Sequence, residues 1–317
     1  MSGRDDILIE EIGTFLSSHG FECSFQMRDG IGVLCITTLD GQHERVILPL
    51  EISAKSPDEA ARHAEEAAGS IRMINFCDGE YPLVVTQDRW NRQREMMEMR
   101  ILAHLELFSP VYARNCEIRR IDKAVAREFL ERTHSYGHAA CRYCYGMFLK
   151  RHTGHIAEGI SQTGTQDDDG DSALSRDIVP GTLVAVATFS NARKWIKGDR
   201  TVRSYEWTRY ASLPQARISG GMGRFLKHFI KEVHPDDIMT YADLEWSKGD
   251  VYVRLGFVPE GQKTPVMFEV DGQWKRSPIK PELWEGGHKG VDACSAGNLY
   301  FRNFGSNKFR LKLTDYE

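Results

Sequence analysis

The chain has 317 residues, of which 41% are hydrophobic, and its 41 lysines and arginines nearly balance its 45 aspartates and glutamates, for a formal net charge of −4. This composition excludes a disordered or collagen-like protein and argues against a strong sequence-independent nucleic-acid binder. No run of about 18 apolar residues occurs, so we expect no membrane-spanning helix. The N-terminal residues lack the apolar core of a signal peptide, and the odd number of cysteines, seven, does not indicate a disulfide framework. We therefore expect a cytoplasmic protein with reduced thiols.

The pattern of helices and strands predicts that residues 1–80 form a small α+β module. No residue spacing in them is typical of catalysis, so we expect this module to be an accessory one. A helix is expected at 7–18, and strands are expected near 21–27, 32–38 and 45–52. A second helix should begin at Pro57, with Ser56 as its N-cap, and should end near Ala68.

Residues 81–111 are predicted to connect this module to the next by a strand at 82–85 and one long helix at about 87–108. One face of that helix carries four arginines: Arg89, Arg92, Arg94 and Arg100. Because glutamates are interleaved with these arginines, we expect a solvated face rather than a phosphate-binding one.

Residues 112–260 alternate strands with helices and predict an α/β or α+β domain. Strands are expected at 117–121, 145–150, 183–190, 203–210 and 238–242, and helices at 124–133 and 224–233. The segment 161–178 holds an aspartate run and almost no apolar residue, so we expect a flexible acidic insertion there. Short apolar runs in 261–317 indicate a C-terminal β extension.

The strongest chemical signal is the turn Ile218-Ser219-Gly220-Gly221-Met222-Gly223-Arg224, which lies between a strand and a helix. Successive glycines let backbone N–H groups point into one concavity, and the helix N-terminus adds partial positive charge. The turn is therefore suited to a pyrophosphate, and an ordinary glycine-containing turn is the alternative. It lacks the lysine of a Walker A loop and the third glycine of a dinucleotide fingerprint.

The order strand, helix, strand, long strand pair, glycine-rich turn, helix and strand, followed by Tyr252-Val253-Arg254-Leu255-Gly256-Phe257, resembles the GCN5-related N-acyltransferase (GNAT) superfamily. The resemblance implies a mixed, mostly antiparallel sheet flanked by helices and the use of acetyl-CoA or another acyl-CoA. It also implies that residues 218–224 hold this cofactor, with Gly221 and Gly223 in the phosphate loop. The sequence departs from the family at Ile218, where Arg or Gln is usual.

A narrower resemblance covers residues 82–300 and links them to a phage and bacterial GNAT-like group that is similar to the phage Mom DNA-modification proteins. It is carried by His134 with Gly137, Tyr205–Arg209, Tyr241–Gly249 and Cys294–Asn298. This resemblance implies a nucleobase or DNA as the acceptor.

Acyl transfer to an amine needs a base for the amine proton and an acid for the departing thiolate. Glu206 and Asp243 are equal candidates for the base, and the resemblance makes Tyr252 the candidate acid, with core packing as the alternative. Arg209 is expected to pair with a carboxylate across the sheet, and a structural Glu206–Arg209 ion pair is the alternative. Three further residues are candidates for substrate contact or support: His134, Trp246 and Ser247.

The spacing His134-x3-His138-x2-Cys141-x2-Cys144 resembles a set of zinc ligands. Structural zinc sites usually separate two ligand pairs by a longer spacer, and Cys144 runs directly into a predicted strand, so we expect no metal site. An alternative role for His134 is to interact with the C-terminal dipole of the preceding helix.

Three functions follow from these observations. The first, which we favour, is an acyl-CoA-dependent N-acyltransferase that acts on an unknown small-molecule or macromolecular amine. The second is a Mom-like nucleic-acid-modifying enzyme, favoured by a basic cluster beside Trp195, with a solvated hairpin as the alternative. That cluster consists of Arg193, Lys194, Lys197, Arg200 and Arg203. The third is a non-catalytic binding module, favoured by Ile218 in the phosphate loop.

Overall fold

The computed structural model describes residues 7–28, 30–38, 41, 43–78, 81–108, 110–151, 178–281 and 297–316. The predicted acidic insertion, up to residue 177, and Cys294 lie outside the described residues. The chain divides into two compact units. Unit 1 comprises Met1–Leu105, Tyr241–Val253 and Pro259–Lys308, and unit 2 comprises Glu106–Thr240, Arg254–Val258 and Phe309–Glu317.

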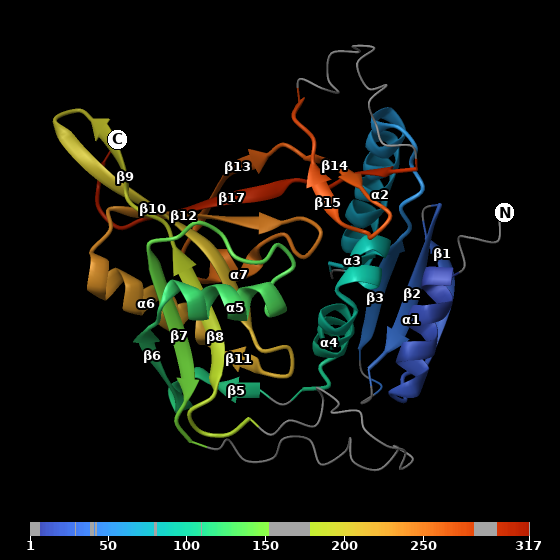
Figure 1. The fold of residues 1–317 in the computed structure, drawn as a ribbon, viewed down its shortest axis with the longest axis horizontal. Helices are drawn as coiled ribbons and strands as arrows, with labels where there is room; N and C mark the ends of the chain where they lie inside the picture. The colour runs from blue at the N-terminus through green and yellow to red at the C-terminus, as the bar shows by residue number, and fades with distance from the viewer. Residues whose placement is uncertain are drawn as a thin grey trace. The chain divides into compact units, whose positions relative to one another are not determined.

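Unit 1 contains a four-stranded sheet in the order β1-β2-β3-β4 (Figure 1). Its strands are β1 (Cys23–Arg28), β2 (Ile31–Thr37), β3 (Glu44–Leu50) and β4 (Leu83–Thr86). The first three strands are antiparallel, and β3 pairs in parallel with β4 after the crossover helix α2 (Pro57–Asp78). Helix α1 (Ile7–Ser18) buries an i, i+4 row of apolar residues, namely Leu8, Ile12 and Leu16. The predicted order helix, three strands, helix is confirmed.

Helix α2 begins where the sequence predicts but ends later. The Ser56 hydroxyl accepts the Glu59 N–H at 3.2 Å, and the Glu59 carboxylate accepts the Lys55 N–H at 2.8 Å, which satisfies two N-terminal donors. The predicted end near Ala68 is wrong, since the helix continues to Asp78. The reason is that Ile71 and Ile74 extend its apolar stripe onto the core of the sheet.

The predicted single helix at 87–108 is two helices, α3 (Gln87–Arg92) and α4 (Arg94–His104). Gln93 separates them, because its backbone angles (φ −123°, ψ 41°) are not helical. The remainder of unit 1 includes α7 (Asp250–Arg254) and a three-stranded antiparallel sheet in the order β15-β14-β16. These strands are β14 (Met267–Val270), β15 (Arg276–Pro278) and β16 (Leu299–Arg302), and they confirm a β-rich C-terminal extension.

Unit 2 follows the predicted order of elements. It contains β5 (Pro110–Tyr112), the 3-10 turn η1 (Ala113–Asn115), β6 (Cys116–Arg120), α5 (Lys123–Thr133), β7 (Tyr143–Leu149), β8 (Leu183–Phe189), β9 (Arg193–Lys197), β10 (Arg200–Ser212), β11 (Arg217–Ser219), α6 (Gly221–Val233) and the start of β12 (Asp237–Asp243). The strand order is β12-β10-β8-β7-β6, with β9 paired to β10, and it continues beyond β12 to β17 (Ser306–Lys312) and β13 (Val258–Lys263). Strands β6, β7, β8 and β10 are antiparallel, whereas β10 and β12 are parallel across α6.

Two helices cover the two faces of this sheet. On one face, Phe229 of α6 stacks on Phe189 with ring centroids 3.9 Å apart. The ring of Tyr205 contacts the ring of Phe229 edge-on. On the other face, Phe129 and Leu130 of α5 pack with buried residues of β7, β8 and β10. The fold is therefore the expected mixed α+β type, with a mostly antiparallel sheet flanked by helices.

Candidate functional site

A bulge in β10 places Glu206 and Arg209 on the same face of the sheet. The ladder between β10 and β8 pairs Trp207 with Phe189 but Arg209 with Thr188, so Thr208 is an extra residue on β10. An extra residue inverts the alternation of side chains along a strand. Residues three apart, which would otherwise lie on opposite faces, therefore share one face here.

Arg209 is held at the end of α5. Its Nε donates to the Gly137 carbonyl at 3.1 Å, and its Nη1 donates to the Thr208 carbonyl at 2.8 Å. Burial lowers the pKa of Arg209, and the charge of Glu206 opposes that shift. No salt bridge joins Glu206 to Arg209 among the residues that the structure describes. The charge of Glu206 acts on Arg209 at longer range.

Strand β10 extends well past its pairing with β12. The parallel ladder covers three pairs, from Ser204–Asp237 to Glu206–Met239, whereas β10 continues to Ser212. Within the described chain, the edge of β10 from Trp207 onward is therefore not laddered to β12. Side chains take over the backbone pairing there: the Trp207 carbonyl accepts Thr240 Oγ1–H at 3.2 Å, and the Arg209 carbonyl accepts Trp207 Nε1–H at 3.0 Å.

The glycine turn forms the start of α6, as predicted. Gly220 is the N-cap in the left-handed region (φ +77°) and supplies no side-chain cap to the first N–H groups. A Cβ on Gly221 would lie 2.6 Å from Ile218 Cγ2 and 3.0 Å from Tyr210 Oη, so the turn packs closely against these side chains and requires glycine here. The first N–H groups of α6 lie without a side-chain cap at the positive end of a 13-residue helix, where an anion is favoured.

The other predicted cofactor residues surround this turn. Ile218 and Ser219 belong to β11, which pairs in parallel with β5. Met222 and Gly223 lie half-buried in the first turn of α6, where a Gly223 Cβ would sit 3.3 Å from Leu255 Cδ2. The Arg224 guanidinium donates to the Ala113 carbonyl and, at 3.0 Å, to that of Cys116, so it ties α6 to β6 and the preceding turn.

Asp243, the other candidate base, belongs to unit 1 and lies in a cluster of charged residues. Its Oδ1 accepts the Glu245 N–H at 2.9 Å, and its Oδ2 lies 3.8 Å from Arg89. Arg89 is 4% exposed and pairs with Glu245 at 2.6 Å. The predicted solvated arginine face is therefore wrong for Arg89, because this side chain is buried against carboxylates.

Arg276 completes this buried charge cluster, which we define as Asp88, Arg89, Asp243, Glu245 and Arg276. It donates to both oxygens of Asp88 and to those of Glu245, the latter at 3.1 and 3.2 Å. Burial raises the pKa of Glu245, which has no exposed side-chain surface, although Arg276 and Arg89 oppose the shift. Sequence reasoning missed Asp88, Glu245 and Arg276, since no local spacing connects them.

The remaining predicted residues have structural contacts of their own. Trp246 lies under two guanidinium groups, those of Arg89 at 4.6 Å and Arg100 at 3.7 Å from the ring centroid. The Ser247 N–H donates to the Asp243 carbonyl at 3.1 Å. Tyr252 lies in α7, so the structure assigns it, with Asp243, Trp246 and Ser247, to unit 1 and not to the unit of Glu206.

His134 ends α5. Its N–H donates to the Leu130 carbonyl at 2.9 Å, and its Nδ1 accepts the Tyr136 N–H at 3.2 Å. This position fits the alternative role at the helix terminus.

The residues weighed as zinc ligands make other contacts. His138 Nδ1 lies 2.5 Å from a Glu131 carboxylate oxygen, and the Sγ atoms of Cys141 and Cys144 are 3.4 Å apart. Over the described ranges, no group of three or more histidine, cysteine or acidic side chains is placed to hold a metal ion. In the same ranges, no helix is long and apolar enough to span a membrane.

No protein-family model and no curated protein matches this sequence. Among solved structures, the chain is similar to one in the NatC complex bound to Gag peptide and CoA, with 9% identity, a TM-score of 0.32, and coverage of 63% of this chain and 99% of that one. It is also similar to the spermidine/spermine N-acetyltransferase SpeG from Vibrio cholerae, solved with manganese ions, with 8% identity, a TM-score of 0.34, and coverage of 63% and 94%. These similarities are low, so function is inferred below from the geometry of the chain itself.

Proposed function

We propose that unit 2 is an N-acyltransferase that uses acetyl-CoA or another acyl-CoA. The observation that carries this proposal is the uncapped glycine start of α6, which follows β10, the strand that carries Glu206, and the short strand β11. The first-turn N–H groups of α6 would bind the pyrophosphate, because no side chain caps them and the helix N-terminus carries partial positive charge. When bound, acyl-CoA supplies the acyl group as a thioester.

In this proposal Glu206 is the general base. It is half-buried on the α5 face and takes a proton from the acceptor amine, directly or through a water molecule. Arg209 is a positioning residue, since it shares a sheet face with Glu206 and is itself held by the Gly137 carbonyl. Asp243 is the weaker candidate, because its oxygens already face Arg89 and the Glu245 N–H. Tyr252, the candidate acid that the resemblance implies, lies in unit 1, so this proposal for unit 2 assigns it no role.

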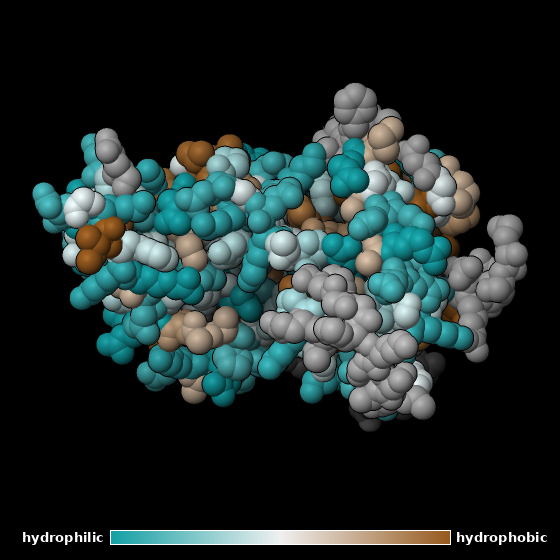
Figure 2. All heavy atoms as spheres, turned by 90° about the horizontal axis from the view of Figure 1, so that it is seen from above, coloured by the Kyte–Doolittle hydropathy of each residue, from teal (hydrophilic) through white to brown (hydrophobic). Residues whose placement is uncertain are grey.

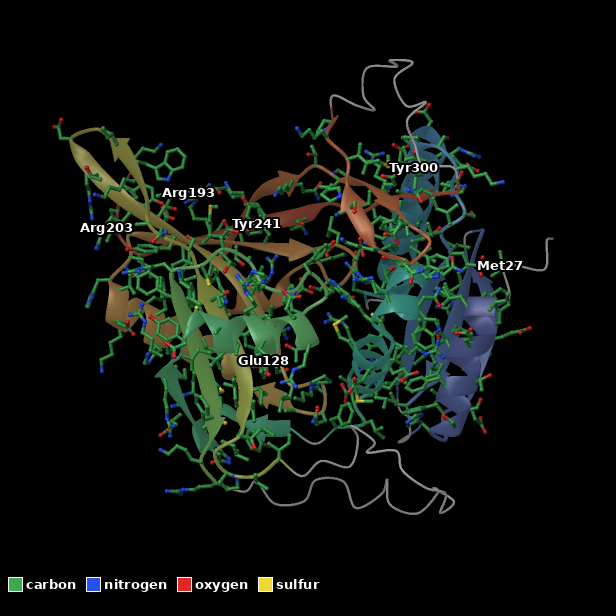
Figure 3. All side chains as sticks on the ribbon, viewed as in Figure 1. Met27, Glu128, Arg193, Arg203, Tyr241 and Tyr300 are labelled. Atoms are coloured by element: carbon green, nitrogen blue, oxygen red, sulfur yellow. The ribbon has the colours of Figure 1, made fainter. Side chains whose placement is uncertain are left out.

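An assay of acetyl-CoA consumption against a panel of primary amines, including a polyamine and a peptide N-terminus, tests the base. We expect Glu206→Gln to lower kcat by about 10²–10⁴ while leaving acetyl-CoA affinity unchanged. The matched control is Glu128→Gln, which changes an exposed carboxylate on α5 (Figure 3) and should leave the rate unchanged. A Glu206→Gln rate within twofold of wild type would contradict the assignment.

A nucleic-acid acceptor is a second candidate, supported by the β9–β10 hairpin. Every residue of β9 is exposed, and alternation places Arg193, Trp195 and Lys197 in a row on one face. Arg193 and Arg203 are labelled on this hairpin in Figure 3. Trp195 and Ile196 are 52% and 83% exposed. The face of the molecule seen in Figure 2 is mainly hydrophilic, with a few hydrophobic spots. Cations beside an exposed indole suit phosphates and stacked bases.

Salt dependence separates this candidate from a small-molecule acceptor. If the hairpin binds single strands, the affinity for an oligonucleotide should fall steeply with salt, by about 0.7 in log–log slope for each phosphate contact. Arg193→Glu combined with Lys197→Glu should abolish binding, whereas Lys227→Glu with Lys231→Glu on α6 should not.

A further inference from the structure

The thiols of Cys141 and Cys144 lie next to each other where the α5–β7 connection enters the sheet. Their Sγ atoms are 3.4 Å apart. Cys144 is buried in β7 against Phe129 and Leu130, whereas Cys141 is half-buried in the irregular residues before that strand. One thiol is therefore accessible to a small reagent, and the second is accessible to the first.

The two cysteines differ in their freedom to move. Cys144 is fixed by the sheet, since it pairs with Thr188 and its carbonyl accepts the Ile121 N–H at 3.0 Å. Cys141 lies in the connection between the end of α5 at Thr133 and the start of β7. A disulfide has an S–S length of about 2.05 Å, so Cys141 must approach Cys144 by about 1.4 Å.

We propose that Cys141 and Cys144 form a reversible disulfide that fixes the α5–β7 connection and slows the reaction of unit 2. The effect on rate rests on the proposed function, whereas the formation of the disulfide does not. The oxidant is a low-molecular-weight disulfide such as oxidised glutathione.

The exchange proceeds in two steps. The Cys141 thiolate attacks one sulfur of the oxidant, forms a mixed disulfide and releases one small thiol. Cys144 then loses its proton and attacks the Cys141 sulfur, which releases the second small thiol. The two protein thiols are oxidised, and the small disulfide is reduced to two thiols. Burial, followed by the contact with Cys141, raises the pKa of Cys144 to about 12, which makes it the resolving rather than the attacking thiol.

The connection that the disulfide would fix also positions Arg209. Gly137 lies in this connection, and its carbonyl accepts the Arg209 Nε–H at 3.1 Å. Moving Cys141 therefore displaces the support of the residue that shares a face with Glu206. A displacement of about 1 Å near reacting groups can lower a rate by about two orders of magnitude. We expect oxidation to lower kcat at least tenfold.

The disulfide is tested first. The full chain is equilibrated in glutathione buffers of increasing oxidised-to-reduced ratio, alkylated, digested with trypsin and analysed by mass spectrometry. Arg142 lies between the cysteines, so trypsin separates them unless a disulfide joins the two peptides. We expect the linked pair to appear with oxidation, to disappear with dithiothreitol and to be absent in Cys141→Ser. Cys141 and Cys144 alkylated at every ratio would overturn the proposal.

Cys116 provides the matched control. It is buried, and its thiol lies 3.8 Å from the Tyr112 carbonyl, so Cys116→Ser should leave the linked peptides unchanged. The rate is then measured on oxidised and reduced protein by transfer of labelled acetyl groups. Linked peptides with an unchanged rate would overturn the regulatory part alone. If neither form transfers acetyl groups, the proposed function fails, and the linked peptides still decide the disulfide.

Discussion

Arg276 holds the buried charge cluster of unit 1 together, and its replacement should be costly. Its side chain is 10% exposed, and those of its partners Asp88 and Glu245 are 3% and 0% exposed. It also donates to the Thr86 hydroxyl at 2.8 Å. Arg276→Met leaves both carboxylates buried without this cation. Removal of one partner from a buried ion pair costs about 3–5 kcal/mol. For domains of 150–250 residues this corresponds to roughly 6–20 °C in the melting temperature.

The pH dependence gives this prediction a sign. Burial raises the pKa of Asp88, but Arg276, with Arg89 and Thr86, holds it below its usual value, so the stabilisation is present above about pH 4 and is lost as the pH falls. In Arg276→Met the pKa values of both carboxylates should rise. The folded variant therefore takes up protons more readily as the pH falls. The difference between its free energy of unfolding and that of wild type should become smaller below about pH 4.

Thermal and urea unfolding between pH 3 and pH 7 measure this deficit. Arg92→Met is the matched control, since it removes an exposed arginine at the end of α3 and should change stability by less than about 0.5 kcal/mol. A loss below about 1 kcal/mol for Arg276→Met, or a deficit that does not change with pH, would refute this reasoning.

Two further predictions concern unit 2 and its turn. Gly221→Ala should lower the free energy of unfolding by about 1–3 kcal/mol in urea unfolding, because its Cβ would lie 2.6 Å from Ile218 Cγ2. Gly272→Ala is the control, because nothing lies within 4 Å of a Cβ at that position. Asp236→Asn should cost roughly 1 kcal/mol at pH 7. Burial raises the pKa of Asp236, but the Arg203 N–H and neighbouring cations lower it by a larger amount, so that it lies below its usual value. The difference in stability between Asp236→Asn and wild type should therefore vanish as the pH falls below about 4. A difference that persists at pH 3 would contradict this assignment.

The sequence predicted best those features that local residues determine. The glycines of 220–223 indicate the start of α6 because their effect on the backbone is confined to the turn in which they lie. The capping of α2 by Ser56 is equally local. The apolar periodicity of the strands predicted the order of elements in unit 2, since one buried face suffices to define a strand.

Features that depend on distant residues could not be predicted. Asp88 and Arg276 are 188 residues apart in sequence, so no spacing indicated that they would meet. The bulge at Thr208 depends on the neighbouring strand, where Thr208 Oγ1 lies 2.8 Å from Thr188 Oγ1. Without this bulge, strict alternation separates Glu206 from Arg209, which is why the sequence did not place them on one face.

Titration calorimetry with acetyl-CoA tests the central claim that the start of α6 binds the cofactor. Met222 lies in the first turn, where a glutamate interacts favourably with the helix dipole, so Met222→Glu should fold as well as wild type while repelling a pyrophosphate. Met222→Gln is the neutral control. The account predicts saturable binding that weakens at least tenfold, about 1.4 kcal/mol, in Met222→Glu and not in Met222→Gln. No binding to wild type at millimolar acetyl-CoA, or equal affinity in all three proteins, would contradict it.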